Sequence, residues 1–376
     1  MPRAICCPNG DVEVHFTTEE SVLLHSSVLK THSEFFSVAL SDRWNTEGAP
    51  LPNATTCGST SIKKWRFELR FEQGSNEGQL YSKPTVTATE LVSGKPTADR
   101  LKNIRAHKGM IRSLFDVAPV LGSSSFARAK ESVELLIDTA VMYSCENAVL
   151  PYVEKHLHRF RTDVFERCTA MPVIMLELAM KTKVDWIFME ATTNLVGRST
   201  RFFKGSKVAL QKLEIVEFME RKRAAFWELL QRCDTGLLLM STKPSDRCET
   251  LAAHAFFKMW LIELLRDVKN HSSLFPGYGN LYYEINSNAT ALKGYVRQQA
   301  LAYWGRLYKT AAQPDPTEAE LIKSFLAGVL ASFQTAAAII KPVTLDATLR
   351  QCKRVDTHRA LTCMTMSKEE VPWAKD

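Results

Sequence analysis

The chain has 376 residues, too many for one ordinary domain, and its 45% hydrophobic and 24% charged residues are typical of a folded protein and exclude a disordered one. Its nine cysteines have no CxxC spacing, which excludes a disulfide framework and indicates a reducing compartment, cytoplasmic or nuclear. The net charge of +7 arises after residue 160, because residues 1–160 hold 18 Lys and Arg against 18 Asp and Glu. So mild a surplus is typical of a soluble surface.

Neither a signal peptide nor a membrane span is expected. No apolar run follows the first residues, where a signal peptide would need one. The longest apolar stretch, 324–340, is shorter than the roughly 20 apolar residues that a spanning helix requires. We therefore predict a buried helix there and no membrane partner.

The stretch 11–44 predicts a β-hairpin followed by two short helices. Apolar and polar residues alternate from Val12 to Phe16, and the alternation resumes at Val22 after a polar turn. The apolar period then becomes helical. Ser33 stands where an N-cap would accept hydrogen bonds from the amides of the second helix.

This stretch resembles the head of the BTB/POZ domain, a protein–protein interaction module. The residues that carry the likeness are Asp11, Val12, His25, Val28, Leu29, Ser33 and Phe36. In many BTB domains a basic residue follows the histidine and shares a pocket with the strand's aspartate, whereas this chain has Ser26. Asp11 is therefore either a carboxylate of a partner pocket or a solvated strand start, and both interpretations stay open. For His25 we expect a structural role, bonding backbone groups at the strand–helix junction.

After this head, the resemblance implies a BTB-like domain over residues 10–160 with a long insertion at about 45–99. The insertion contains the clearest strand of the chain, 65–72, with alternate apolar residues on one face, and a weaker return strand near 80–88 in which Pro84 indicates an edge position.

Helical periodicity begins at Arg100. A stripe of Met110, Ile111, Leu114 and Phe115 is similar to a BTB helix, and 131–157 is similar to the last two helices of that domain. Pro151 is placed where a new helix could begin.

The remaining residues, 161–376, predict an all-helical region. Residues 207–233 read as one amphipathic helix of about seven turns, ending before Gly236. A second helix, 252–265, is expected to be largely buried, with His254 and Lys258 on one wet stripe. Thr317 and Glu320 form a capping-box pattern before a helix from Leu321 to Ile340, which Pro342 is expected to stop.

A search for chemistry is negative. The sequence has no GxGxxG, P-loop, HExxH or GxSxG motif. His156 and His158 are two apart, which on a helix places them on different sides, so we predict surface histidines and not metal ligands. Cys352, His358 and Cys363 are similarly loose in spacing. We expect no catalytic residue, no cofactor and no metal.

The run Glu220 to Arg223 has the basic composition of a nuclear import signal. Arg221 and Arg223 fit the solvent face of the predicted helix, and a solvated helix face is the interpretation we favour.

The resemblance implies a non-enzymatic adaptor. BTB domains commonly form homodimers through the first helix and N-terminal strand, and many bind a cullin scaffold of a ubiquitin ligase through helices around the third strand. The candidate interaction residues are Asp11, His25, Ser26 and Phe115. The helical remainder would then hold the substrate, as in the BTB proteins of filamentous fungi that this chain looks most like. The alternative is a nucleic-acid or chromatin-associated regulator that uses the basic helical region, which predicts steep salt dependence of binding.

Overall fold

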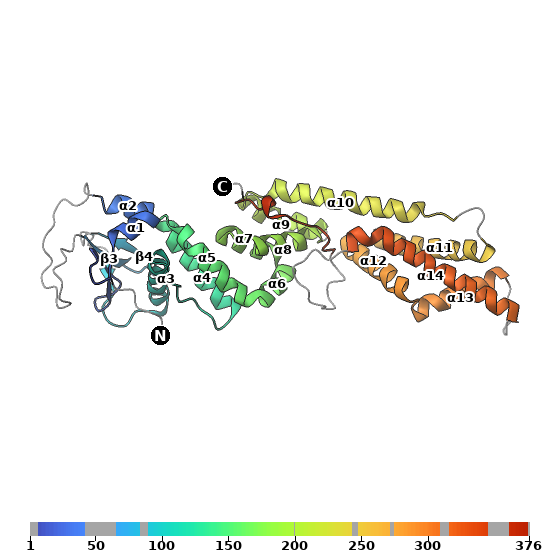
Figure 1. Cartoon of the computed structure of the whole chain (residues 1–376), viewed down its shortest axis with the longest axis horizontal. Helices are drawn as coiled ribbons and strands as arrows, with labels where there is room; N and C mark the ends of the chain where they lie inside the picture. Colours follow the sequence, from blue (N-terminus) through green and yellow to red (C-terminus); the bar gives the residue numbers. More distant parts are fainter. Residues whose placement is uncertain are drawn as a thin grey trace. The chain divides into compact units, whose positions relative to one another are not determined.

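The computed structural model describes residues 7–41, 65–82, 89–198, 200–242, 247–270, 274–308, 316–344 and 361–374. These residues are mostly helical, with one small sheet near the N-terminus (Figure 1), which confirms the predicted α+β, mostly helical class. The chain divides into two compact units. Unit 1 contains residues 1–164 and 181–184, and unit 2 contains residues 165–180 and 185–376.

A five-stranded sheet forms one side of unit 1. Its strands are β1 (Val12–His15), β2 (Ser21–Leu24), β3 (Trp65–Glu72), β4 (Gly78–Tyr81) and β5 (Thr89–Leu91). The order is β2-β1-β3-β4, and β5 also pairs with β3. β1 and β3 are parallel, with Val12 opposite Trp65, and the other pairs are antiparallel. Three strands thus lie within the range expected as an insertion, whereas Pro84 lies outside the described residues.

Alternation along the strands places the core as predicted. Val12, Val14, Phe67, Leu69 and Phe71 are all at most 1% exposed. β5 was not predicted, because three residues are too few for a periodic signal. The polar face of β3 differs from expectation: Glu68 is only 8% exposed and binds Arg70 Nη2 at 2.7 Å and Arg66 Nη2 at 2.8 Å. Burial raises the pKa of Glu68, but the bonds from Arg70 and the charge of Arg66 outweigh it and lower that pKa overall.

Five α-helices accompany this sheet in unit 1. They are α1 (Ser26–His32), α2 (Glu34–Ala39), α3 (Ala98–Leu114), α4 (Phe126–Met142) and α5 (Glu146–Leu157), followed by the 3-10 turn η2 (His158–Phe160). The predicted N-cap is confirmed, because Ser33 Oγ accepts a hydrogen bond from the amide of Phe36 at 3.1 Å.

The helix start predicted at Pro151 is wrong. Pro151 lies inside α5, which begins at Glu146. A proline inside a helix loses one backbone hydrogen bond. Here Val149, Val153 and Leu157 are fully buried on the same helix, and their packing outweighs the local preference.

A hydrogen-bonded cluster around Tyr143 ties the core of unit 1 together. The Tyr143 hydroxyl accepts the amide of Leu80 at 2.8 Å, and Ser33 Oγ donates to the Tyr143 carbonyl at 2.6 Å. His107 Nδ1 lies 2.9 Å from the carbonyl of Asn103, so Nδ1 carries the proton and Nε2 accepts from the Tyr143 hydroxyl at 3.1 Å. Burial lowers the pKa of the fully buried His107 to about 4. One residue therefore joins α2, α3 and β4 at the end of α4.

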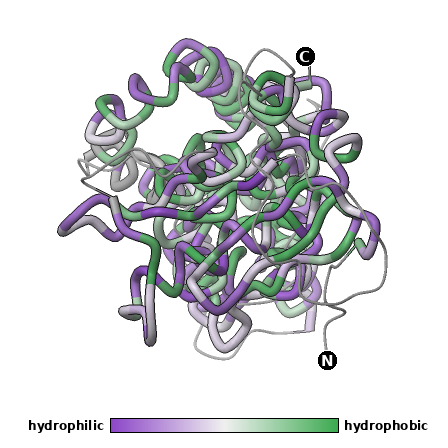
Figure 2. Tube along the Cα trace, turned by 90° about the vertical axis from the view of Figure 1, so that its left-hand side faces the viewer, coloured by the Kyte–Doolittle hydropathy of each residue, from purple (hydrophilic) through white to green (hydrophobic). Residues whose placement is uncertain are grey.

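The described residues of unit 2 are mostly helical, and the segment 361–374 is the part without an α-helix. Its helices are α6 (Arg161–Ala170) and α7 (Pro172–Thr182), both of which cross the division between the units, then α8 (Asp185–Val196), α9 (Thr200–Lys212), α10 (Val216–Leu239), α11 (Cys248–Asn270), α12 (Leu274–Thr290), α13 (Gly294–Tyr308), α14 (Pro316–Thr344) and the 3-10 turn η4 (Lys368–Glu370). Hydrophobic and hydrophilic residues alternate along the trace, as amphipathic elements require (Figure 2).

The long helix predicted over 207–233 is two helices. α9 ends at Lys212 and α10 begins at Val216, and between them Glu214 has φ 57°, a left-handed conformation that ends a helix. Apolar residues continue across the break, since Leu210 and Ile215 are both buried, so periodicity alone could not reveal it. Val208, expected in the apolar stripe, is 66% exposed. Gly236 lies within α10 and does not end it.

The solvent-facing position predicted for Arg223 is also wrong. Arg223 is 6% exposed, and its Nη1 donates to the carbonyls of Val196 and Arg198, each at 3.1 Å. Its guanidinium lies 4.6 Å from the centre of the Phe203 ring. Burial lowers the pKa of Arg223 to about 10. The side chain satisfies carbonyls at the end of α8, a long-range contact that a helical wheel does not show.

The central helix of the C-terminal bundle is α14. It starts at Pro316, so Thr317 lies inside it and not at its cap, and Pro342 lies within its last turn instead of ending it. The buried Val343 anchors that last turn. By length and composition α14 is the one described helix that could span a membrane, and 28% of its apolar window is buried. Phe325, Val329 and Phe333 form the buried face, which packs against α11 and α12.

Candidate functional site

Asp11 and Ser26 form a local pair at the edge of the sheet in unit 1. Asp11 precedes β1, and its Oδ1 accepts the amide of Ser26 at 2.7 Å while its Oδ2 accepts the Ser26 hydroxyl at 2.6 Å. Burial raises the pKa of Asp11, but the bonds from Ser26 outweigh it, so the pKa is lowered overall. Asp11 thus holds the first turn of α1, and Ser26 supplies the partner expected from a basic residue.

The other predicted interaction residues fall in two places. His25 occupies the N-cap position of α1 without making a capping hydrogen bond, and its charge acts on Asp11. Phe115 is the C-cap residue of α3, where its amide donates to the Arg112 carbonyl at 3.1 Å. Asp11, His25 and Ser26 therefore lie together at the start of α1, whereas Phe115 lies at the C-terminal end of α3.

A cavity of about 660 Å³ opens between α3, α4 and the loop that joins them. We call it the α3–α4 groove. This volume is within the range of ligand pockets. The groove is lined by Lys102, Arg105, Ala106, Val120, Leu121, Gly122, Ser123, Ser124, Arg128, Glu131, Ser132, Leu135 and Leu136.

The loop wall of the groove is pinned at Gly122. The Gly122 amide donates to Ser132 Oγ at 3.2 Å, and its carbonyl accepts from His156 Nε2 at 2.9 Å. A Cβ at Gly122 would lie 2.8 Å from Ser132 Oγ and 3.0 Å from the Arg128 carbonyl, so any larger residue must displace the loop. The surface position predicted for His156 is wrong, since it is 7% exposed and burial lowers its pKa. The wall is therefore formed before any partner binds.

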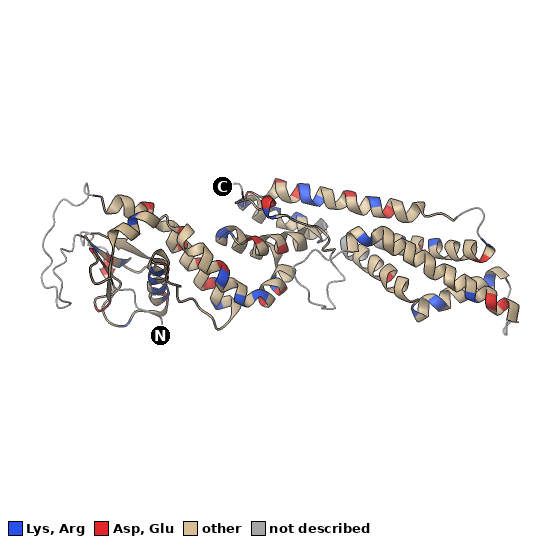
Figure 3. Cartoon of the chain, in the orientation of Figure 1, with Lys and Arg blue, Asp and Glu red and all other residues tan. Residues whose placement is uncertain are grey.

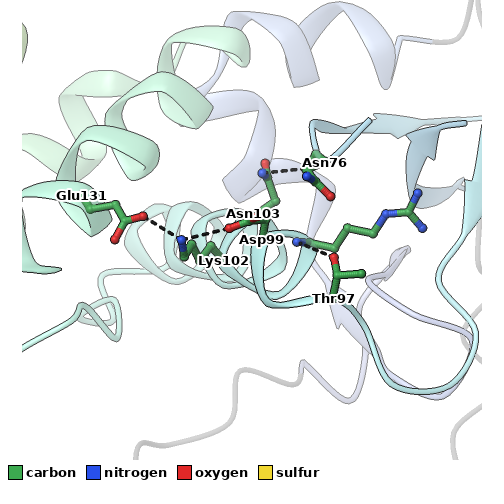
Figure 4. Close-up of polar contacts among 7 residues, drawn as sticks. Asn76, Thr97, Asp99, Lys102, Asn103 and Glu131 are labelled. Carbon is green, nitrogen blue, oxygen red and sulfur yellow. Dashed lines mark hydrogen bonds and ion pairs between the residues drawn. The ribbon is translucent and has the colours of Figure 1, made fainter. Parts of the chain in front are cut away.

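An ion-pair bridge joins the two helices at one end of the groove. Lys102 Nζ lies 2.9 Å from Asp99 Oδ1 and 2.8 Å from Glu131 Oε1, as Figure 4 shows. The start of α3 is fixed beside it, because Asn103 Nδ2 donates to the Asn76 carbonyl at 2.8 Å (Figure 4). The hydrogen bond to Glu131 is the main cause that raises the pKa of Lys102. Among the described residues that line the groove, Glu131 is the one carboxylate, and it is thus already engaged.

Two arginines in the lining are left without a carboxylate. Arg105 on α3 and Arg128 on α4 are both exposed, and neither forms an ion pair with any described residue. Figure 3 shows Lys and Arg distributed along α3. Apolar side chains lie beside these charges, including Val120, which is 60% exposed, and Leu121. The groove combines uncompensated positive charge with an apolar surface, a combination suited to binding.

The described lining of the groove contains no His or Cys, and its single acid, Glu131, is paired. Throughout the described ranges, no group of three His, Cys, Asp or Glu side chains could hold a metal ion. Of the loose set noted in the sequence, Cys352 and His358 lie outside the described residues, and burial raises the pKa of the Cys363 thiol to about 12.

Sequence reasoning missed the α3–α4 groove. The available signal was the three-residue spacing of Lys102 and Arg105, which places them on one helix face, followed by the Gly–Ser loop at Gly122. Arg128 joins them only through the packing of α4 on α3. No protein-family model and no curated protein matches the chain.

Proposed function

We propose that the chain is a non-enzymatic protein-interaction adaptor whose unit 1 is a BTB/POZ-like domain. The elements of unit 1 support this: a β-hairpin leads directly into the short helices α1 and α2, a third strand pairs with β1, and α3, α4 and α5 pack together. The Asp11–Ser26 pair supplies locally what a basic residue supplies in many BTB domains. As the resemblance implies, the domain forms a homodimer.

The observation that carries the proposal is the α3–α4 groove. Its wall is held by Gly122, and Arg105 and Arg128 face solvent without a carboxylate partner among the described residues. A protein segment with acidic and apolar side chains would pair these charges and cover Val120 and Leu121. A cullin scaffold is the partner that the resemblance implies, and unit 2 would then hold the client.

Size-exclusion chromatography with light scattering tests this proposal on the full chain, with and without a purified cullin N-terminal domain. We expect a dimer alone and a larger complex with the cullin domain. The double variant Arg105→Glu with Arg128→Glu should lose the complex but keep the dimer, because it reverses the groove charge. Lys155→Glu is the matched control, since Lys155 is exposed on α5 and lies outside the groove lining.

Three outcomes would count against the proposal. If the chain does not bind the cullin domain, that domain is excluded as the partner. If the double variant still forms the complex, the α3–α4 groove is excluded as the binding surface. Steep, salt-dependent binding to nucleic acid in place of protein would instead favour the alternative of a nucleic-acid-associated regulator.

A further inference from the structure

The C-terminal segment 361–374, which we call the strap, lies on helices α8 and α10 of unit 2. Three of its side chains are buried: Leu361 and Cys363 at 6% exposed, and Val371 at 2%. Apart from the single turn η4, the strap contains no helix or strand. Its position therefore depends on contacts with the helices below and not on a secondary structure of its own.

The backbone of the strap approaches the end of α8 closely. A Cβ at Gly197 would lie 2.0 Å from the Leu361 carbonyl oxygen, so only glycine allows this approach. Three residues further along the strap, the Met364 carbonyl accepts a hydrogen bond from Thr193 Oγ1 of α8 at 3.2 Å. These contacts recognise main chain, whatever the side chains of the bound segment.

The other end of the strap is recognised through side chains. Trp373 Nε1 donates to Asp185 Oδ1 at 2.7 Å, and its ring meets that of Phe188 edge-on at 5.4 Å. Glu370 forms an ion pair with Lys222 of α10, whose side chain is 13% exposed. Burial raises the pKa of Glu370, but the bond from Lys222 outweighs it, so the pKa is lowered overall.

A capping box shapes the strap between these anchors. The Ser367 side chain accepts the Glu370 amide, and Glu370 Oε2 accepts the Ser367 amide at 3.0 Å. The turn so formed directs Glu370 towards Lys222 and sets its spacing from Trp373. Spaced apolar anchors, one acid and one indole on a short segment are the means by which helical surfaces bind linear peptides.

We propose that this surface of α8 and α10, which we call the strap site, is a peptide-recognition site that the chain's own C-terminal segment occupies in cis. Its partner is a protein segment of the same chemistry: two apolar residues at alternate positions, then a capped turn with an acid, then a Val-x-Trp ending. The strap shares the chain with its site and competes at a high effective concentration. A partner therefore binds by displacing it. This inference concerns unit 2 and stands apart from the α3–α4 groove.

The test uses the full chain with a specific protease site placed within 345–360 and cut after folding. A fluorescent peptide of residues 361–374 is then titrated and its anisotropy measured. We expect saturable binding to the cut chain and at least about tenfold weaker binding to the uncut chain. Peptides with Trp373→Ala or Glu370→Lys should bind at least about tenfold more weakly, whereas Thr365→Ala, at an exposed position, should bind like the parent.

A charge swap makes the test reciprocal. The Lys222→Glu chain should prefer the Glu370→Lys peptide over the parent peptide, because the ion pair is restored with its sign reversed. Equal binding of all four peptides, or no binding to a cut chain of unchanged helicity, would overturn the proposal. So would loss of helicity on cutting, since the strap would then be part of the core.

Discussion

The α3–α4 groove and the strap site place a cation beside apolar surface, but only one of them is filled. In the strap site, Lys222 already pairs with Glu370, and Val371 is buried beside them. In the α3–α4 groove, Arg105 and Arg128 face solvent next to the exposed Val120. The difference teaches that the two proposed sites are distinguished by the pairing state of their charges more than by the number of charges.

The largest effect should come from Phe36→Asp, which should unfold the unit that holds the α3–α4 groove and leave the strap site in unit 2 intact. Phe36 is fully buried against Phe67 and Tyr143, so a carboxylate there should cost at least about 4 kcal/mol and unfold unit 1. Urea unfolding followed by circular dichroism would measure the loss, and hydrogen exchange would show whether the strap stays protected. Val38→Asp on the same helix is the control, since Val38 is 55% exposed. A Phe36→Asp chain as stable as the control would disprove the placement of α2.

Acid should weaken unit 1 through His107. Its pKa is about 4 in the folded chain against 6.5 for an ordinary histidine, so the unfolded state binds more protons between these values. The stability contributed by neutral His107 is complete above pH 6.5 and is lost as the pH falls towards 4. At about 1.4 kcal/mol per pH unit the loss is about 3 to 4 kcal/mol in all. Unfolding free energies of the parent and His107→Gln should therefore converge on acidification. Parallel curves would contradict the buried, neutral assignment.

A glycine in each surface gives a matched pair of smaller effects. In the strap site, Gly197→Ala should displace the strap and cost about 1 to 3 kcal/mol, because the added Cβ meets the Leu361 backbone. Gly205→Ala in α9 is the control, because nothing lies within 4 Å of its Cβ. Limited proteolysis of the strap would report the difference, and equal protection in both variants would count against the close approach.

The smallest effect is expected for Gly122→Ala in the open groove. The added Cβ must move the loop away from Ser132, at about 1 kcal/mol of stability, since the loop is only partly buried. Partner binding should weaken more than stability falls, because Val120 and Leu121 move with the loop. Titration calorimetry with the cullin N-terminal domain would measure the change in affinity. Unchanged affinity would show that the loop wall does not take part.

The sequence predicted those features of the fold that depend on local pattern. The hairpin, the Ser33 cap and the apolar stripe of α3 follow from residues a few positions apart. What it missed depends on distant partners: Ser33 binds Tyr143, 110 residues away, and Trp373 binds Asp185, 188 residues away. No periodicity encodes such pairs.

The same limit applies to the candidate site. Asp11 and Ser26 could be named from the resemblance, and they do contact each other. The α3–α4 groove could not be predicted, because Arg105 and Arg128 line the same groove only once α4 packs on α3. Arg223 and His156 seemed solvent-facing because the carbonyls that bury them belong to other elements.

Hydrogen exchange of the full chain, with and without the cullin N-terminal domain, tests the proposed adaptor function most directly. We expect new protection in the loop 117–124 and the first turns of α4, with the strap amides unchanged while the partner occupies only the α3–α4 groove. Protection that leaves this loop unchanged and falls elsewhere on unit 1 would contradict the assignment of the groove as the docking surface.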